Sequence, residues 1–157
     1  RVNICVFCSN KQIGRIMTWW EQRGYVATLL VWDKPNPIPL GNGCYINNLE
    51  FIVYVREKGV TYNSLGYDMQ LKTFRNQPPQ AAQRIHETEK PVSLLQRLLL
   101  LHTSEGDVVF DAYAGSFSTA IACHNEKRKF IGCEILEKYF EPAMKRLRGA
   151  VAQKSLF

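Results

Sequence analysis

The chain has 157 residues, 46% of them hydrophobic, and a formal net charge of +6. This length and composition fit a single folded domain and exclude a disordered chain. No apolar run approaches the roughly 18 to 20 residues of a membrane span, so no membrane partner is expected. The modest basic excess permits a polyanionic partner such as nucleic acid without requiring one.

The number and placement of the cysteines predict reduced thiols without disulfide bonds. There are five, an odd number, and the start of the chain has no signal-peptide pattern, which together favour a cytosolic setting. Cys5 and Cys8 form a Cys-x-x-Cys pair, but they lie in a strand-like run where they would face opposite sides of a sheet. No second pair completes a zinc site, so no metal is predicted and the thiols are expected to be buried.

The first half of the chain predicts strands around one helix. Val2 to Ser9 and "YVATLLVW" are typical of buried strands, and Gly24 is placed to end the helix between them. Three prolines and two glycines make "DKPNPIPLGNG" a loop. "LEFIVYVRE" is again strand-like, and the composition from 58 to 85 is polar and irregular.

The second half alternates helix and strand. The predicted elements are a helix over "PVSLLQRLLLLH" with Pro91 in its first turn, a strand at "DVVFD", a helix over 116–125, a strand at "RKFIGCEI" and a helix over 137–148. Such alternation implies a parallel or mostly parallel sheet covered by helices on both faces. Ligands of such sheets bind beyond the carboxyl ends of the strands, where Asp111 and Glu134 are expected.

The stretch after Asp111 is suited to close approach of a ligand. Small residues such as Gly115 and Ser116 let the backbone turn sharply, and amides at the start of the next helix favour an anionic or carbonyl-bearing group. One strand–helix–strand unit later, Glu134 offers a carboxylate that can accept both hydroxyls of a ribose. The pattern therefore predicts a site for a nucleoside-bearing cofactor.

Two absent motifs narrow the choice of cofactor. A dinucleotide site would need Gly-x-Gly-x-x-Gly, whereas this turn offers only Gly115, and the Gly-x-x-x-x-Gly-Lys-Ser/Thr of a P-loop is missing. A nucleoside without a pyrophosphate remains, and S-adenosylmethionine fits because it joins a ribose and an adenine to an amino-acid tail. The alternative is an ordinary strand–turn–helix in which Asp111 caps the helix.

The segment "TEKPVSLLQRLLLLHTSEGDVVFDAYAGSFSTAIACHNEKRKFIGCEI" joins Glu-Lys-Pro, an apolar helix, a strand ending in Asp, a small-residue turn and Phe-Ile-Gly-x-Glu. In this order it resembles the DNA amino-methyltransferases that act on adenine N6 or cytosine N4, in the group with the beta motif order. "VNICVFCSNKQ", "LLVWDKPNPIP" and "NNLEFIVYVREKG" resemble the preceding segments of that family, so the resemblance covers most of the chain.

The resemblance implies the three-layer α/β sheet of the class I S-adenosylmethionine-dependent methyltransferases, a Rossmann-like fold. It implies one domain over 1–157, with 40–85 as a short irregular target-recognition insertion. By position, Asp111, Tyr113, Gly115 and Ser116 would line the methionine and ribose side of S-adenosylmethionine, Glu134 would bind the ribose hydroxyls, and Lys90 and Pro91 would border the methionine tail.

Two residues depart from the family pattern at the turn. Ala112 replaces the usual Pro, and Phe117 stands where a second Gly is expected. Because Gly lets the backbone pass close to the cofactor, a Phe must point its side chain away or crowd the site. Cofactor affinity is therefore expected to be weak or lost.

The catalytic motif of the family, Asp/Asn/Ser-Pro-Pro followed by Tyr, Phe or Trp, is missing from the chain. In the family its polar groups accept the hydrogens of the exocyclic amine and its aromatic stacks on a flipped base. The family order places this motif upstream of Arg1. "NQPPQ" at 76–80 has no stacking aromatic and is expected to be a loop, so no catalytic residue is assigned here and no methyl transfer is expected from this chain alone.

The resemblance also implies double-stranded DNA as a partner. The candidate phosphate contacts are Lys34, Arg56, Lys58, Lys72 and Arg75. Aromatic residues between these cations could stack on exposed bases, and a solvated loop over a few core aromatics is the alternative. The three histidines, His86, His102 and His124, are expected to be surface or capping residues.

Two functions follow. In the first, the chain is most of a site-specific DNA methyltransferase of a restriction-modification type, adenine N6 favoured over cytosine N4, in the cytoplasm of a bacterium or encoded by a phage. In the second, it is an inactive DNA-binding or regulatory subunit that pairs with an active methyltransferase. A homodimer is also considered, because one of Trp19 and Trp20 is expected to be exposed at a subunit contact.

Overall fold

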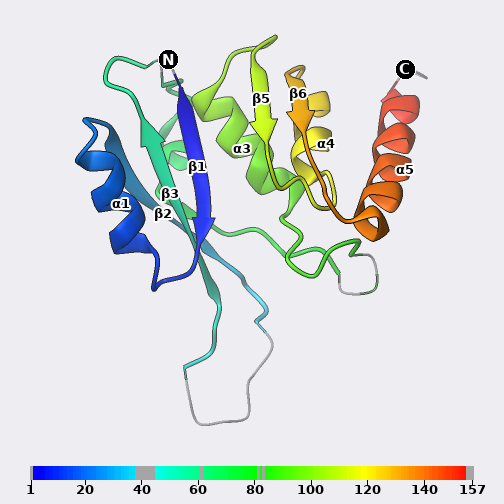
Figure 1. Cartoon of the computed structure of the whole chain (residues 1–157), viewed down its shortest axis with the longest axis horizontal. Coiled ribbons are helices and arrows are strands. Elements are labelled where there is room, and N and C mark those ends of the chain that lie inside the picture. The colour runs from blue at the N-terminus through cyan, green and yellow to red at the C-terminus, as the bar shows by residue number, and fades with distance from the viewer. Residues whose placement is uncertain (1, 38–44, 61, 81, 83, 155–157) are drawn as a thin grey trace. The chain divides into compact units, whose positions relative to one another are not determined.

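The computed structural model describes residues 2–37, 45–60, 62–80, 82 and 84–154. These divide into two compact units, Arg1–Gln77 and Pro78–Phe157. The single domain expected over 1–157 stays a prediction. Residues 40–44 of the predicted insertion lie outside the described residues, and so does Cys44. Each unit is described below by itself (Figure 1).

The first unit is a sheet with one long helix. Its elements are β1 (Asn3–Cys8), α1 (Ile13–Glu21), β2 (Val26–Asp33), β3 (Leu49–Arg56), the single-turn α2 (Tyr67–Gln70) and β4 (Thr73–Phe74). The strand order is β1-β3-β2-β4, and α1 packs against β2 and β3. The predicted strands and helix of this region are thus confirmed, although β1 is half-buried and not buried as expected, and Gly24 ends the helical segment with a φ of 83°. "NQPPQ" is a loop, as expected.

The predicted parallel sheet is wrong for this unit. β3 pairs antiparallel with both β1 and β2, and only the short β4 runs parallel to β2. The physical reason lies in the sequence between β2 and β3: its three prolines and two glycines disfavour the crossover helix that a parallel pairing would need, so antiparallel pairing is favoured. β3, α2 and β4 lie inside the range 40–85, so its described part is not wholly irregular.

The core of the first unit is formed along β2, β3 and β4. Trp32, Ile52, Val55 and Phe74 are all exposed by 1% or less. The indole N–H of Trp32 donates to the carbonyl oxygen of Asn76 at 2.8 Å, which fastens the chain beyond β4 to β2. A buried indole needs such an acceptor, so this bond fixes the path of the segment after the sheet.

The second unit is a two-stranded parallel sheet with helices. Its elements are α3 (Val92–His102), β5 (Val108–Asp111), α4 (Ser118–Asn125), β6 (Lys129–Gly132) and α5 (Glu137–Lys154). β5 and β6 pair in parallel with Asp111 opposite Gly132. Every element predicted here is confirmed, although α5 continues six residues past the predicted end at Arg148. Figure 1 shows α3 and α4 on the same side of the β5–β6 pair.

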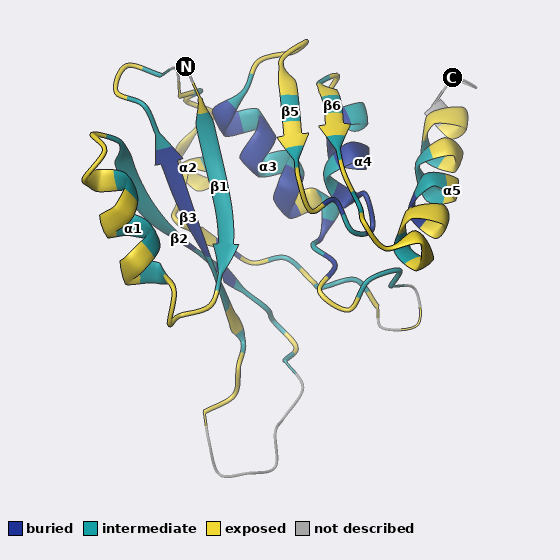
Figure 2. Ribbon diagram, viewed as in Figure 1, coloured by how far each residue is buried: buried dark blue, intermediate teal, exposed yellow. Residues whose placement is uncertain are grey.

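One face of the β5–β6 pair is buried under α3 and α4, and the other is open. The outward residues Val108, Phe110 and Ile131 are exposed by 58%, 66% and 57%, and Figure 2 shows exposed segments on both β5 and β6. The expectation that helices cover both faces is therefore wrong for this pair in the described part of the chain. Parallel strands normally have both faces covered, so this surface is unusual for the fold.

Phe117 occupies a left-handed backbone conformation just before α4. Its φ is 59° and ψ 26°, a region in which L-residues other than Gly are disfavoured by roughly 1–2 kcal/mol. The side chain is only 4% exposed and packs with Ala114, Ala120 and Ala143, and its ring centroid lies 6.2 Å from that of Phe130. The side chain of Phe117 therefore points into the core of the unit.

The burial of the cysteine and histidine side chains agrees only in part with the predictions. Burial raises the pKa of the Cys5 thiol to about 12 and that of Cys123 to about 11, in keeping with structural thiols. Cys133 is exposed, so the expectation of burial is wrong for it. His102 is buried in α3 and burial lowers the pKa of its imidazole to about 4, so it is not the surface or capping residue expected.

None of the described helices is long and apolar enough to cross a membrane. Within the described ranges, no three His, Cys, Asp or Glu side chains gather where they could hold a metal ion.

Gly132→Ala should destabilise the protein by about 1–3 kcal/mol, because overpacking forces its neighbours to move. A Cβ at Gly132 would lie 2.3 Å from the Phe130 ring and 3.0 Å from the Asp111 carbonyl oxygen. Gly149→Ala is the matched control: nothing lies within 4 Å of its Cβ, so helix propensity should raise stability by about 0.5–1 kcal/mol. Chemical unfolding measures both, and two changes of the same sign would contradict the packing.

At Phe117 we expect Gly to be tolerated better than Ala. Phe117→Ala should lower the free energy of unfolding by about 3–5 kcal/mol through loss of core packing. Phe117→Gly loses the same packing but adopts a positive φ freely, so it should be about 1 kcal/mol less destabilised. In an ordinary helix an Ala variant is more stable than a Gly variant, so the order of stability expected here is reversed. An Ala variant more stable than the Gly variant in urea unfolding would refute the left-handed conformation.

Candidate functional site

The carboxyl ends of β5 and β6 meet at one edge of their sheet. Asp111 is the last residue of β5, and Glu134 follows β6 by two residues. The strands are adjacent and parallel, so the two carboxylates emerge at the same edge. The turn that carries Tyr113 to Ser116 leaves from this edge, and the structure thus brings the predicted acids and the predicted turn together.

Asp111 fixes the beginning of the turn. Its Oδ1 accepts the backbone N–H of Tyr113 at 3.0 Å, and its Oδ2 accepts the hydroxyl of Thr119 at 2.7 Å. The residue before α4 is Phe117, and no side chain caps that helix. The alternative that Asp111 is a helix cap is therefore wrong: the carboxylate ties the strand end to its own turn and to the first turn of α4.

Glu134 holds the middle of the same turn. Its Oε2 accepts the N–H of Gly115 at 3.0 Å, and its Oε1 accepts the N–H of Leu136 at 2.8 Å. An ionised carboxylate has about four acceptor positions, and these bonds use two of them. Each oxygen of Glu134 can therefore still accept a hydrogen bond from a ligand hydroxyl.

The turn itself presents both backbone and an aromatic ring. Gly115 has a φ of 51°, a conformation that Gly adopts without strain. The ring of Tyr113 is 92% exposed, whereas Ser116 is 3% exposed and its hydroxyl lies 3.1 Å from that of Ser118. Tyr113 is thus available to a ligand through its side chain, and Ser116 is turned toward the interior of the unit.

Lys90 and Pro91 precede α3 in the same unit. Pro91 is buried at the N-cap position of α3, and the ammonium group of Lys90 donates to the carbonyl oxygen of Thr88 at 3.0 Å. The Lys90 side chain is therefore folded back over its own loop.

Three residues near the turn were not predicted as parts of the site. The imidazole carbons of His86 lie 3.8 Å from the Cβ position of Gly115, and its ring centroid is 4.3 Å from that of Tyr139. Thr119 contacts Asp111, and Arg146 of α5 reaches the carbonyl oxygen of Ser116 at 3.4 Å. Only Thr119 follows a local pattern, one helical turn after the Gly-Ser turn; the other two are brought in by tertiary packing. His86 is half-buried rather than a surface residue.

The five predicted DNA contacts do not form one surface. β2 and β3 are antiparallel, and β4 runs beside the end of β2, so Lys34, Lys72 and Arg75 lie at one end of the first unit's sheet. Arg56 and Lys58 lie at the other end, about 20 Å away along an eight-residue strand. The structure thus divides the predicted cations into two groups.

The first of these groups borders a pocket with a volume of about 380 Å³. Its lining residues are Asp33, Lys34, Pro35, Pro37, Ile46, Asn48 and Arg75. Two ion pairs balance its charge: Lys34 with Glu50 at 3.4 Å and Arg75 with Asp33 at 3.8 Å. Lys72 is exposed beside β4 and forms no ion pair within the described residues.

Several known proteins are similar to this chain. The family model described as "DNA methylase" (N6_N4_Mtase) matches residues 3–145. The "Putative methylase YubD" of Escherichia coli is 40% identical over 149 residues, which is 92% of this chain and 60% of that protein. The "DNA adenine methyltransferase YhdJ" of Escherichia coli is 44% identical over 62 residues, 40% of this chain and 21% of that protein.

Among solved structures, that of the M1.HpyAVI–SAM complex superposes with a TM-score of 0.83 at 31% identity. The match covers 92% of this chain and 74% of that one. The chain spans 60% or less of the length of the first curated relatives that it matches. With a family model matched across almost the whole sequence, the chain belongs to the N6/N4 family of DNA methylases, whose fold is that of the class I S-adenosylmethionine-dependent methyltransferases.

Proposed function

We propose that this chain contains the S-adenosylmethionine-binding part of a DNA methyltransferase. The observation that carries the proposal is the double attachment of one turn to two carboxylates: Asp111 holds its first amide and Glu134 holds the amide of Gly115. Membership of the family and the similarity to M1.HpyAVI, solved as a SAM complex, support the same cofactor.

The residues of this edge suit that cofactor chemically. The remaining acceptor positions of Glu134 can take the two ribose hydroxyls. Asp111, Gly115 and Ser116 would border the methionine and ribose side with backbone and carboxylate, and the exposed ring of Tyr113 can lie against the ligand. Lys90 and Pro91 would border the methionine tail. Phe117 leaves this space free, because its side chain is in the core.

The transferred group would be the sulfonium methyl of the cofactor, and its acceptor the exocyclic amine of an adenine or a cytosine. The motif that would activate this amine is not in the sequence, and we propose that it lies in polypeptide preceding Arg1, in one methyltransferase domain with residues 1–157. Adenine N6 is favoured over cytosine N4 because YhdJ is named an adenine methyltransferase. An inactive DNA-binding or regulatory subunit that pairs with an active methyltransferase is the second candidate.

For contact with double-stranded DNA we propose the end of the first unit's sheet where Lys34, Lys72 and Arg75 gather. Three cations, an exposed lysine among them, lie here beside a pocket large enough for polar groups of a nucleotide. To contact phosphates, Arg75 and Lys34 would first have to leave their carboxylate partners. Lys72 could contact a phosphate without breaking an ion pair of the described residues. The other two cations, Arg56 and Lys58, are at the wrong end of the sheet for this surface.

Glu134→Gln should weaken S-adenosylmethionine binding by about ten- to a hundredfold, because a charged acceptor of the ribose hydroxyls is lost. Glu137→Gln, an exposed carboxylate three residues further on, is the matched control and should leave affinity unchanged. Isothermal titration measures both, with thermal unfolding to verify folding. No heat and no thermal shift from the unsubstituted protein would reject the cofactor and favour the regulatory subunit.

Lys72→Glu should lower affinity for duplex DNA by about tenfold at low salt and reduce the slope of log affinity against log salt by about 1. Lys58→Glu makes the same charge change on an exposed lysine at the opposite end of the sheet and should have little effect. Fluorescence anisotropy across a salt series compares them. Equal losses in the two variants would mean that net charge, rather than this end of the sheet, determines binding.

A further inference from the structure

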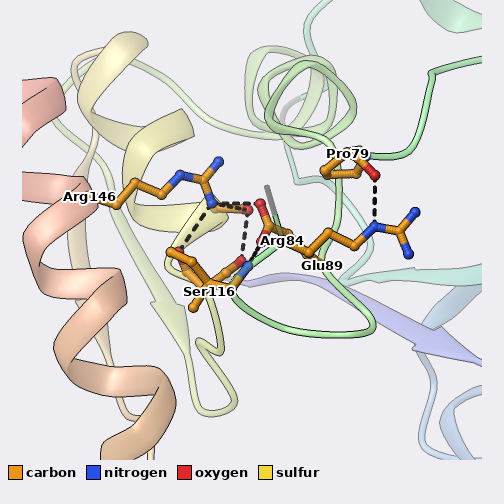
Figure 3. Close-up of polar contacts among 7 residues, drawn as sticks. Pro79, Arg84, Glu89, Ser116 and Arg146 are labelled. Carbon is orange, nitrogen blue, oxygen red and sulfur yellow. Dashed lines mark hydrogen bonds and ion pairs between the residues drawn. The ribbon is translucent and has the colours of Figure 1, made fainter. Parts of the chain in front are cut away.

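Glu89 is a buried carboxylate directly before Lys90 and Pro91. Its side chain is 1% exposed, yet each of its two oxygens has a hydrogen-bond partner. Oε1 accepts a hydrogen bond from the guanidinium of Arg146 at 2.6 Å, and Oε2 accepts the backbone N–H of Ile85 at 3.0 Å (Figure 3). A buried carboxylate without such partners would strongly destabilise the fold, so this pair fixes the segment that contains Glu89.

Arg146 connects that segment to the turn at the end of β5. The nitrogen that contacts Glu89 also lies 3.4 Å from the carbonyl oxygen of Ser116 and 3.5 Å from the hydroxyl of Ser118. Figure 3 shows the guanidinium of Arg146, from α5, directed at both Glu89 and Ser116. One guanidinium on α5 therefore touches two segments that are far apart in sequence, and its planar fork suits it to more than one acceptor.

A second contact joins the same two segments. The N–H of Glu89 donates to the carbonyl oxygen of His86 at 3.1 Å, which closes the loop on which both residues lie. The imidazole of His86 then rests against Gly115 and the ring of Tyr139. The loop before Lys90 is thus packed onto the turn at Gly115 as well as tied to it through Arg146.

The two halves of the turn have different supports. The Gly115 side is held by Glu134, and the strand end by Asp111. The Ser116 side is held by Arg146, and Arg146 is oriented by Glu89. Loss of the Glu89–Arg146 pair should therefore loosen Ser116 and the loop before Lys90 while Gly115 keeps its attachment to Glu134.

We infer that Glu89 and Arg146 form a positioning pair, which couples the loop before Lys90 to the Ser116 side of the turn and so sets the recognition of the cofactor's amino-acid tail. This inference rests on the proposed function. Neither residue is assigned a contact with the cofactor. Their role is to hold Lys90, Pro91 and the Ser116 backbone at a fixed separation, and positioning of this kind is lost when either partner is removed.

The test compares S-adenosylmethionine with adenosine, which has the same ribose and base but no amino-acid tail. Glu89→Gln and Arg146→Met should each weaken S-adenosylmethionine binding about tenfold and change adenosine binding less than twofold. The double variant should be no worse than either single variant, because the two side chains act as one unit. Arg146→Lys, which keeps the charge, should recover part of the affinity. Glu87→Gln and Arg148→Lys, exposed neighbours on the same two segments, are the matched controls.

A purely structural role would lower the affinity for both ligands together and would overturn the inference, as would an unchanged affinity for S-adenosylmethionine. Hydrogen exchange of the ligand-free protein gives a separate measurement. Amides of residues 116–118 should exchange faster in Arg146→Met, with α3 and β6 unchanged; an unchanged turn would overturn the coupling. If the unsubstituted protein binds neither ligand, the proposed function fails, and the exchange experiment still decides whether the pair holds the turn.

Discussion

The bond from the Gly115 amide to the Glu134 carboxylate is the constraint on which the candidate site depends. It joins a turn that leaves β5 to a residue two positions after β6, and its length of 3.0 Å is typical of an N–H···O hydrogen bond. The turn needs an acceptor for its amides, because a buried N–H without one is costly. The acceptor comes from the neighbouring strand, so the parallel pairing of β5 and β6 is what makes the turn possible.

Two kinds of interaction hold the turn around this bond: hydrogen bonds to carboxylates and the packing of an aromatic side chain. Asp111 and Glu134 accept hydrogen bonds from amides of the turn, while Phe117 places its ring in the core with Ala114 and Ala120. The cost of the left-handed conformation at Phe117 is offset by burial of an aromatic side chain, which is worth more. A residue that seems unsuited to the turn by its backbone preference is thus retained by what its side chain packs against.

The first unit is stabilised by other interactions than the candidate site. Its sheet is held by apolar side chains of β2 and β3 and by the bond from Trp32 to Asn76. Its cations at the β2 end are mostly paired with carboxylates, so the end of the sheet is polar without being strongly basic. The proposed contact with DNA at such a surface would require ion pairs to exchange partners, and its affinity would then be sensitive to salt and moderate in strength.

Much of this arrangement could be predicted from residue patterns. Apolar runs and the Gly and Pro residues at their ends located every strand and helix of the second unit, and small residues between Asp111 and Phe117 marked the turn. These signals are local, because they depend on side-chain period and on backbone freedom over a few residues. The resemblance in the motifs of the second half then indicated the family to which the chain belongs.

Other features were decided by contacts between distant segments. The sequence determined which residues form strands, but the antiparallel order β1-β3-β2 followed from how the chain returns after β2. The sequence also contains the five predicted DNA-contacting cations, but only the pairing of the strands places them at two ends of a sheet. In the same way, Arg146 meets Glu89 only when the elements of the second unit pack. Local preference fixes the shape of each element, whereas the burial of side chains from several elements at once selects their neighbours, and no window of sequence contains that information.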